Sequence, residues 1–318
     1  MTRAWLLAVV AACKHDAPPP AASPPAGSAA VAAVSTVSCA AVPFAVSTPV
    51  PEASGAAWLA VAGKTVVVTM GDSDRDGAYG LIDPESGDTL ETGKLPLGDA
   101  GDDLEGLAVR DGVLYGLTSA GWMRAWKRTG TGIGSGGFDL VDGPYPLGPV
   151  DLPDKSSHDR PPKTDGMVCG ARGVNCGRNY EGLCLPAHPS GACAGYAVAK
   201  ADGHLYCLAD AGDADHPGRF AVRREPALEL GRPGAIADCA FAADTDELYV
   251  GANGFALNAV SRVVGWRDLA TAHVEPIGDL GLGFCEGLAV RGDDIYRFSD
   301  LGGAPSLTTK FRCTSLPR

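Results

Sequence analysis

The amino-acid sequence predicts an all-β protein: a β-propeller of five blades, or of six if its longest loop contains one. The main evidence is a repeated phrase, which reads EGLAVRDGVLY from Glu105 to Tyr115 and EGLAVRGDDIY from Glu286 to Tyr296. A repeat of strand, turn and strand at a spacing of roughly 40 to 50 residues is typical of propeller blades. The 43 glycines and 24 prolines agree with it, because they favour many turns over long helices. Related phrases begin at Ser54, Glu181 and Asp238.

Size and charge limit the remaining possibilities. With 318 residues and 45% apolar content the chain can bury a large core, and one repeat-built domain is the simplest organisation. The formal net charge of -12 argues against nucleic acid and against an anionic membrane surface as partners, because the sequence has no basic stripe that could release phosphate counterions. An acidic surface suits cations.

The first residues predict a targeting signal. Arg3 is followed by the apolar run AWLLAVVAA, which is too short to span a bilayer and has the character of a signal-peptide core. The next residue is Cys13, and VAAC resembles the bacterial lipobox, which implies cleavage before Cys13 and lipidation of its sulfur. The prediction is a lipoprotein signal peptide at 1–12 and a lipid-anchored protein on the periplasmic or cell-surface side of a bacterial envelope. An ordinary secretory signal with an incidental cysteine is the alternative.

Residues 13–37 are predicted to form a tether between the lipidated Cys13 and the folded body. The segment is rich in Pro, Ala and Ser and poor in large apolar side chains, so it cannot bury enough surface to become ordered. The propeller domain is expected at 38–318.

Short β-branched and aromatic runs between Gly and Asp turns predict the strands of each blade. The last blade is one strand short, and the segment VSCAAVPFAV at 37–46 is expected to supply its outer strand and so close the ring. An irregular loop at about 147–178 separates the second blade from the third, and such loops often carry function. The blades are expected to begin near residues 52, 102, 179, 237 and 284.

Nine cysteines lie beyond Cys13, and an exported chain favours disulfides. Spacing alone does not assign the pairs. A closed propeller would bring Cys39 and Cys313 together. Zinc is a weak alternative, because the sequence has no CxxC pair and no Cys/His cluster at ligand spacing. The other expected pairs are Cys169 with Cys176, Cys184 with Cys193 and Cys239 with Cys285, which leaves Cys207 over.

The order of the phrases resembles two known propeller families. SGAAW, DDLEGLA, NYEGL, ADCAF and CEGLA follow one another as in the SdiA-regulated periplasmic family and the phytase-like family, the latter named for an esterase-like activity. The resemblance covers about residues 52–311, and it implies an envelope propeller with metal-dependent phosphoester hydrolysis as a candidate activity. The chain departs from the family where second strands end: Thr118-Ser119 and Ser299-Asp300 stand where an acid is common.

The sharpest local motif is DSDRDG, from Asp72 to Gly77, which matches the first half of a calcium loop. Carboxylates at alternate positions converge on a hard cation if the chain turns sharply at the glycine. The predicted ligands are Asp72, Asp74, Asp76 and, at the last loop position, Asp83. The alternative is a solvated turn, because Asp and Gly are ordinary turn residues.

The repeated acids form a second candidate site. Equivalent points of the blades lie on one ring around the axis, so Glu105, Glu181, Asp238 and Glu286 are expected at one channel mouth, where they could bind a ligand or a cation. The alternative is structural: each acid bonds backbone N–H groups of the next blade and joins the blades without any ligand.

The predicted function is therefore an envelope lipoprotein that binds calcium and a small ligand or protein partner at a channel mouth. A calcium-dependent phosphoesterase is the first alternative; it would use arginines such as Arg124, Arg223, Arg262 and Arg312 for phosphate. A structural scaffold is the second. A serine or cysteine hydrolase has little support, because no GxSxG elbow is present and no Ser or Cys is paired by local sequence with a base.

Overall fold

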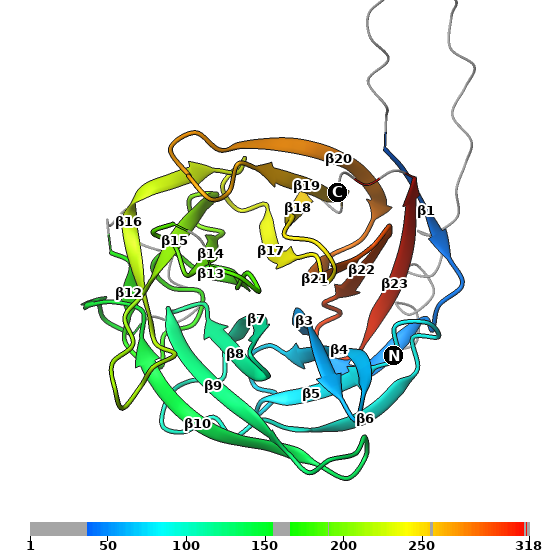
Figure 1. Ribbon diagram of the computed structural model, residues 1–318, viewed down its shortest axis with the longest axis horizontal. Helices are drawn as coiled ribbons and strands as arrows, with labels where there is room; N and C mark the ends of the chain where they lie inside the picture. The colour runs from blue at the N-terminus through cyan, green and yellow to red at the C-terminus, as the bar shows by residue number, and fades with distance from the viewer. Residues whose placement is uncertain (1–36, 155–165, 190, 255–256, 315, 317–318) are drawn as a thin grey trace, which may run out of the picture.

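A computed structural model describes residues 37–154, 166–189, 191–254, 257–314 and 316. Five antiparallel sheets stand in a ring around a central axis, so the chain is a five-bladed β-propeller (Figure 1). This confirms the all-β prediction and the smaller of the two predicted blade numbers. The described residues contain no helix, and therefore none long and apolar enough to cross a membrane.

Each blade has its first strand at the centre of the ring and its last strand at the rim. The inner strands are β3 (Ala53–Val61), β7 (Leu104–Arg110), β13 (Tyr180–Cys184), β17 (Ile236–Phe241) and β21 (Cys285–Arg291). The second strands are β4 (Lys64–Gly71), β8 (Val113–Thr118), β14 (Gly195–Ala199), β18 (Leu248–Gly254) and β22 (Asp294–Ser299). The third are β5 (Ala78–Ile82), β9 (Trp122–Thr129), β15 (His204–Asp210), β19 (Leu257–Val264) and β23 (Pro305–Thr314). The fourth are β6 (Thr89–Lys94), β10 (Gly137–Pro146), β16 (Phe220–Glu229), β20 (His273–Leu282) and, for the fifth blade, β1 (Ser38–Val42) with β2 (Ser47–Pro51).

The N-terminal segment closes the ring as predicted. Strand β1 pairs with the end of β23, with Cys39 opposite Cys313, and β2 pairs with the beginning of β23. Figure 1 shows β1 lying beside β23, so the first and last described strands share one blade. This pairing covers an edge that would otherwise be exposed.

The structure explains the repeated Glu-Gly-Leu phrase residue by residue. In β7 the pairing with β8 shifts between Leu104 and Gly106, so Glu105 occupies a bulge and its side chain is released from the regular alternation. A Cβ on Gly106 would lie 2.5 Å from the backbone nitrogen of Leu183 in the next inner strand, so only glycine lets the two strands approach this closely. The phrase is therefore both a bulge and a contact between blades.

The core lies between neighbouring blades, where apolar faces of successive sheets pack together. Edge-to-face aromatic pairs such as Tyr115 with Phe220 and Tyr79 with Phe138 fill the wider outer part of these interfaces. At one end of the axis the residues are smaller, and alanines are the commonest among them. This arrangement supports the inner strands from outside and leaves the axis itself open to form sites.

Two of the four predicted disulfides are confirmed, and the other two predicted pairs are wrong. Cys39 bonds Cys313 and Cys169 bonds Cys176, as expected. The predicted pairs of Cys184 with Cys193 and of Cys239 with Cys285 are wrong. Cys184 ends an inner strand that packs against the next inner strand and bonds Cys239 there, whereas Cys193 precedes β14 and bonds Cys207 of the adjacent β15. The unpaired cysteine is buried Cys285 rather than Cys207.

The loop predicted at 147–178 contains a small parallel sheet of β11 (Val150–Leu152) and β12 (Val168–Cys169). Residues 155–165 of this loop lie outside the described part, as do Cys13, the signal peptide predicted at 1–12 and the tether apart from Val37.

Candidate functional site

The bulge residues of the inner strands gather at one mouth of the central channel. Glu105, Glu181 and Glu286 occupy equivalent bulges, and Ser54 takes this position in the first blade. Three of the four acids predicted for the ring are thus brought together. The side chains of Glu105 and Glu181 are almost completely buried, with 3% and 1% of their surface exposed.

Asp238 is the exception and requires a correction. The pairing of β17 with β18 places Asp238 where the other blades have the glycine, and Ala237 stands at the acid's position. The carboxylate of Asp238 accepts hydrogen bonds from the backbone N–H of Cys239 and, at 2.8 Å, from that of Leu288 in the next blade. Asp238 therefore joins blades four and five, which is the structural role considered above. Burial raises the pKa of this carboxyl well above its usual range, although both hydrogen bonds act to lower it.

A second ring of side chains surrounds the first. The residue just past the first pairing position of each inner strand lies at the same mouth, because second strands run antiparallel to inner strands; it directly follows the second strand in four blades and lies near the end of β18 in blade four. These residues are Asp72, Ser119, Lys200, Asn253 and Asp300, in blade order.

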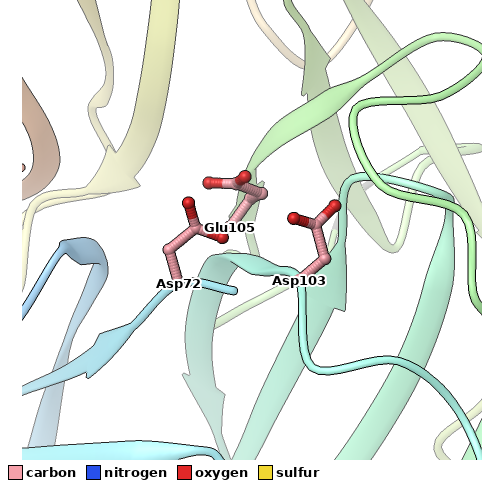
Figure 2. A group of neighbouring side chains, drawn as sticks. All are labelled: Asp72, Asp103 and Glu105. Carbon is pink, nitrogen blue, oxygen red and sulfur yellow. The ribbon is translucent and has the colours of Figure 1, made fainter. Parts of the chain in front are cut away.

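Three carboxylates from two blades form the tightest group at this mouth. Asp72 follows β4, while Asp103 and Glu105 come from the segment that enters β7. One oxygen of each lies within 4.8 Å of the others, and Figure 2 shows the three side chains grouped together. Asp103 and Glu105 are buried and Asp72 is partly exposed, so the group is reached from the Asp72 side.

Hydroxyl groups hold these carboxylates in place. Ser54 donates to Glu105 Oε2 at 2.5 Å, and Ser73 donates to both Asp72 and Asp103. Ser119 also donates to Asp103. These neutral donors position the acids without neutralising them, so ionised carboxylates here would still be stabilised by a cation.

The loop between blades two and three supplies a further contact. The backbone N–H of Asn175 donates to Asp103 Oδ2 at 3.2 Å and to Ser119 Oγ at 2.8 Å. The neighbouring Cys176 is bonded to Cys169, which fixes the turn that presents this N–H. The loop that the sequence marks as irregular thus reaches the acid group.

Burial and mutual repulsion disfavour ionisation of Asp72 and Glu105. Burial, with the charge of Asp103 as the next cause, raises the pKa of Asp72 from 3.8 to about 8. Burial also raises the pKa of Glu105 well above its usual value, and the charges of Asp72 and Glu181 act in the same direction. At neutral pH these carboxylates must therefore either keep protons or share a cation.

On the other side of the mouth the protein supplies its own cation. Lys200 Nζ lies 2.9 Å from Glu181 Oε2 and 3.8 Å from Glu286 Oε1. Burial alone would lower the pKa of Lys200, but the charges of the two glutamates raise it above its usual range. The pKa of Glu181 is still raised to about 8, because its burial outweighs the nearby ammonium. The two glutamates on this side thus have a lysine partner, whereas no described basic side chain forms an ion pair with Asp72, Asp103 or Glu105.

The structure separates the four acids of the predicted calcium hairpin. Only Asp72 belongs to the acid group. Asp74 is exposed, and Asp76 is exposed and paired with Lys94 at 2.7 Å. Asp83 lies beyond the far end of β5 and accepts hydrogen bonds from the backbone of its own turn. The intervening strand carries Asp83 about 17 Å along the blade, so the four cannot share an ion.

The arginines considered for phosphate do not converge on the mouth. Arg124 is buried and donates to the backbone carbonyls of Leu97 and Gly101, and Arg223 is exposed. Arg262 pairs with Glu275, and Arg312 pairs with Asp294. These residues support strands and loops rather than one pocket.

Two important residues, Asp103 and Lys200, are missing from the sequence-based site. Asp103 precedes the repeated phrase, at a position where the first blade has Glu52 and the other three blades have no acid. Lys200 could have been found, because the end of the second strand was recognisable in each blade and Asp72, Ser119, Lys200 and Asp300 all stand there. The useful signal was this second repeated position and not the hairpin motif.

Comparisons with known proteins give fold likenesses only. No family model matches the chain, and no curated protein matches its sequence. A glutaminyl cyclase of Myxococcus xanthus is similar over 87% of this chain and 97% of its own, with 16% identity and a TM-score of 0.46. The Cps50 β-propeller domain of Myceliophteria thermophila (8% identity, TM-score 0.38) matches 81% of this chain and 83% of its own. A protein from Lactobacillus plantarum has 16% identity and a TM-score of 0.36, and the match covers 83% of this chain and 88% of that one. None is similar enough to say what this chain binds.

Proposed function

We propose that this propeller is a calcium-binding protein of the bacterial envelope, anchored by a lipid on Cys13. The calcium ion would be held at the channel mouth by Asp72, Asp103 and Glu105. The single observation that carries the proposal is the grouping of three carboxylate oxygens within 4.8 Å, from side chains that form no ion pair with a described basic residue.

Calcium suits this set of ligands better than softer metals. All three groups are carboxylates supported by hydroxyls, and hard oxygen ligands are those that Ca²⁺ prefers. Oxygens on opposite sides of a Ca²⁺ ion are about 4.6 to 5.2 Å apart, given ligand distances of about 2.3 to 2.6 Å. The observed spread therefore fits one ion.

A calcium ion held in this way would also bind a further ligand. Ca²⁺ takes about six to eight oxygens, and three carboxylates that each bind through one oxygen leave positions for other ligands. The remaining positions face the open side of the mouth beside Asp72, where a small molecule or a partner protein could supply oxygens. This is the physical basis for a binding role.

The phosphoesterase alternative has less support than the binding role. Phosphate chemistry calls for Arg or Lys donors converging beside the metal. Lys200 is the basic side chain that the described structure places at the mouth, and it already contacts two glutamates. The resemblance to SdiA-regulated and phytase-like propellers stays a prediction, as does the lipid anchor.

The first prediction tests the metal ligands. Calorimetric titration of the wild-type protein with Ca²⁺ is expected to show one site, and Glu105→Gln is expected to weaken it by about tenfold or more, because one of three charged ligands is lost. Asp76→Asn is the matched control, since Asp76 belongs to the hairpin motif but lies outside the acid group. Absence of binding in the wild type would contradict the proposal, and loss of binding in Asp76→Asn alone would move the site to the hairpin.

The second prediction concerns the number of ions. Replacing Lys200 by methionine keeps the length of the side chain but leaves Glu181 and Glu286 without their ammonium group. Two buried carboxylates that have lost their cation are expected to bind another one. Calorimetry should then show two Ca²⁺ ions per chain instead of one. An unchanged stoichiometry in a folded Lys200→Met protein would show that Lys200 does not occupy a cation position.

A further inference from the structure

The other end of the central channel holds a cavity of about 320 Å³. Inner strands run from the acid mouth towards this cavity, so its walls come from later positions of the same strands. Ala57, Leu107, Leu183 and Ala240 are among its lining residues, and Trp58 and Phe241 are its aromatic walls. The cavity is separate from the acid group, since none of those acids lines it.

The cavity is built for an apolar occupant. None of its lining residues is charged, although 20% of the chain is charged, and most of them are alanine, leucine or valine. The small alanines keep the space from being filled by the protein itself. An open hollow with such walls gains free energy when apolar surface replaces water, and its volume is at the lower end of the roughly 300 to 1,000 Å³ typical of ligand pockets.

The length of the cavity matches an alkyl chain. Its lining follows β3 from Ala56 to Ala60, which at about 3.3 Å per residue is about 13 Å. An extended alkyl chain advances about 1.3 Å per carbon, so about ten carbons fit along this wall. Thr65 supplies the one side-chain hydroxyl of the lining.

The folded body begins at this same end of the molecule. Ser38 pairs with Thr314 of β23, and β23 runs towards the end of blade five that holds Arg291. The guanidinium of Arg291 lies 5.6 Å above the ring of Trp58, which lines the cavity. The segment before Ser38 therefore starts on the face where the cavity opens.

The chain before Ser38 is long enough to reach the cavity. Residues 14–37 separate Cys13 from β1, and a random coil of this number of residues spans about 27 Å on average. From β1 to the inner strand β21 there are three strand spacings of about 4.8 Å each, or about 14 Å. A group carried on Cys13 would thus be present at high local concentration beside the cavity, which favours it over a free molecule.

We infer that the cavity binds an acyl chain carried by the protein's own Cys13. The inference rests on the proposed lipidation, but it assigns a different site from the calcium site. The bound chain would shield the anchor from water whenever the protein is away from a bilayer, and release it when a bilayer offers more apolar surface.

Photo-crosslinking tests this inference on the whole chain. Cells that express the protein are fed a fatty acid with a diazirine in its alkyl chain, the protein is irradiated, and cross-linked peptides are identified by mass spectrometry. Cross-links from the Cys13 lipid to the peptides around Trp58 and Phe241 are expected. Ala60→Trp, which blocks the cavity at an exposed position, should lose them, whereas Ala211→Trp at an exposed position outside the lining should keep them.

The outcomes separate the inference from the proposed anchor. The mass of the N-terminal peptide in the same sample shows whether Cys13 carries a lipid, so an unmodified Cys13 refutes the anchor itself. A lipidated Cys13 without cross-links to the cavity overturns the inference. Equal cross-linking in Cys13→Ser also overturns it, because the occupant would then be a free lipid.

Discussion

Replacing both Cys39 and Cys313 by serine is expected to lower the free energy of unfolding by about 4 to 5 kcal/mol, the largest effect of any change considered for this chain. The reason is the length of chain that this disulfide closes, because its cysteines are 274 residues apart in sequence. Without the bond, the unfolded chain regains nearly all the freedom that a closed loop denies it. Denaturant unfolding of the oxidised wild type and the double variant measures the difference.

The disulfide between Cys169 and Cys176 is the matched control. Its cysteines are only seven residues apart, so the loop-closure argument gives about half the stabilisation, about 2 to 3 kcal/mol. Unequal losses in this order would support closure of the ring as the main role of the Cys39–Cys313 bond. Equal losses, or a larger loss from the short loop, would contradict it.

The fold could be predicted from the sequence because its repeat is a packing rule that every blade obeys. The glycine after the bulge residue is needed where two inner strands approach, so Gly55, Gly106 and Gly182 recur for a local steric reason. The closing strand could be predicted because one blade lacked its last strand. Such features belong to single strands and to the turns between them.

The candidate site could be predicted only in part, because it joins positions that no single blade contains. Asp103 and Asp72 come from different blades, and nothing local pairs them. The predicted ring aligns Asp238 with the glutamates, but in the strand it stands one position after the bulge. A shift of one residue moves a side chain from the mouth to a contact between blades. A disulfide between neighbouring blades could be predicted at Cys239, but not its partner: Cys239 bonds Cys184 of the preceding blade, and spacing does not distinguish this from Cys285 of the following blade.

Asp238 also shows why the repeated acids are not one kind of group. Its carboxylate reaches the N–H of Leu288, at the position where the other blades have a glycine and direct backbone contact. Glu105, Glu181 and Glu286 instead stand in bulges and face one another across the mouth. Substitution by alanine would therefore affect stability at Asp238, calcium binding at Glu105, and the partner of Lys200 at Glu181 or Glu286.

The stability of the calcium-free protein is expected to fall as pH rises, which is the reverse of ordinary acid denaturation. Asp72 changes from a pKa of 3.8 to about 8 on folding, and Glu181 changes from 4.5 to about 8. An acid with a raised pKa binds its proton more tightly when folded, so between about pH 4 and pH 8 the folded state carries more protons than the unfolded state. The contribution of such a carboxyl to stability is present at a pH below its pKa in the unfolded state. It is lost as the pH rises through its pKa in the folded state.

Melting temperatures measured with a chelator should therefore decrease between about pH 5 and pH 9. The corresponding loss in the free energy of unfolding is about 3 kcal/mol over this range. The loss is smaller than the two shifts would give if added, because neighbouring carboxyls titrate together. Saturating Ca²⁺ should remove most of the decrease, since the ion stabilises the charged carboxylates that the proton otherwise neutralises. Glu105→Gln should flatten the profile without calcium, because it removes one of the repelling charges. A wild-type profile that is flat, or that rises over this range, would show that the mouth is ionised without a cation.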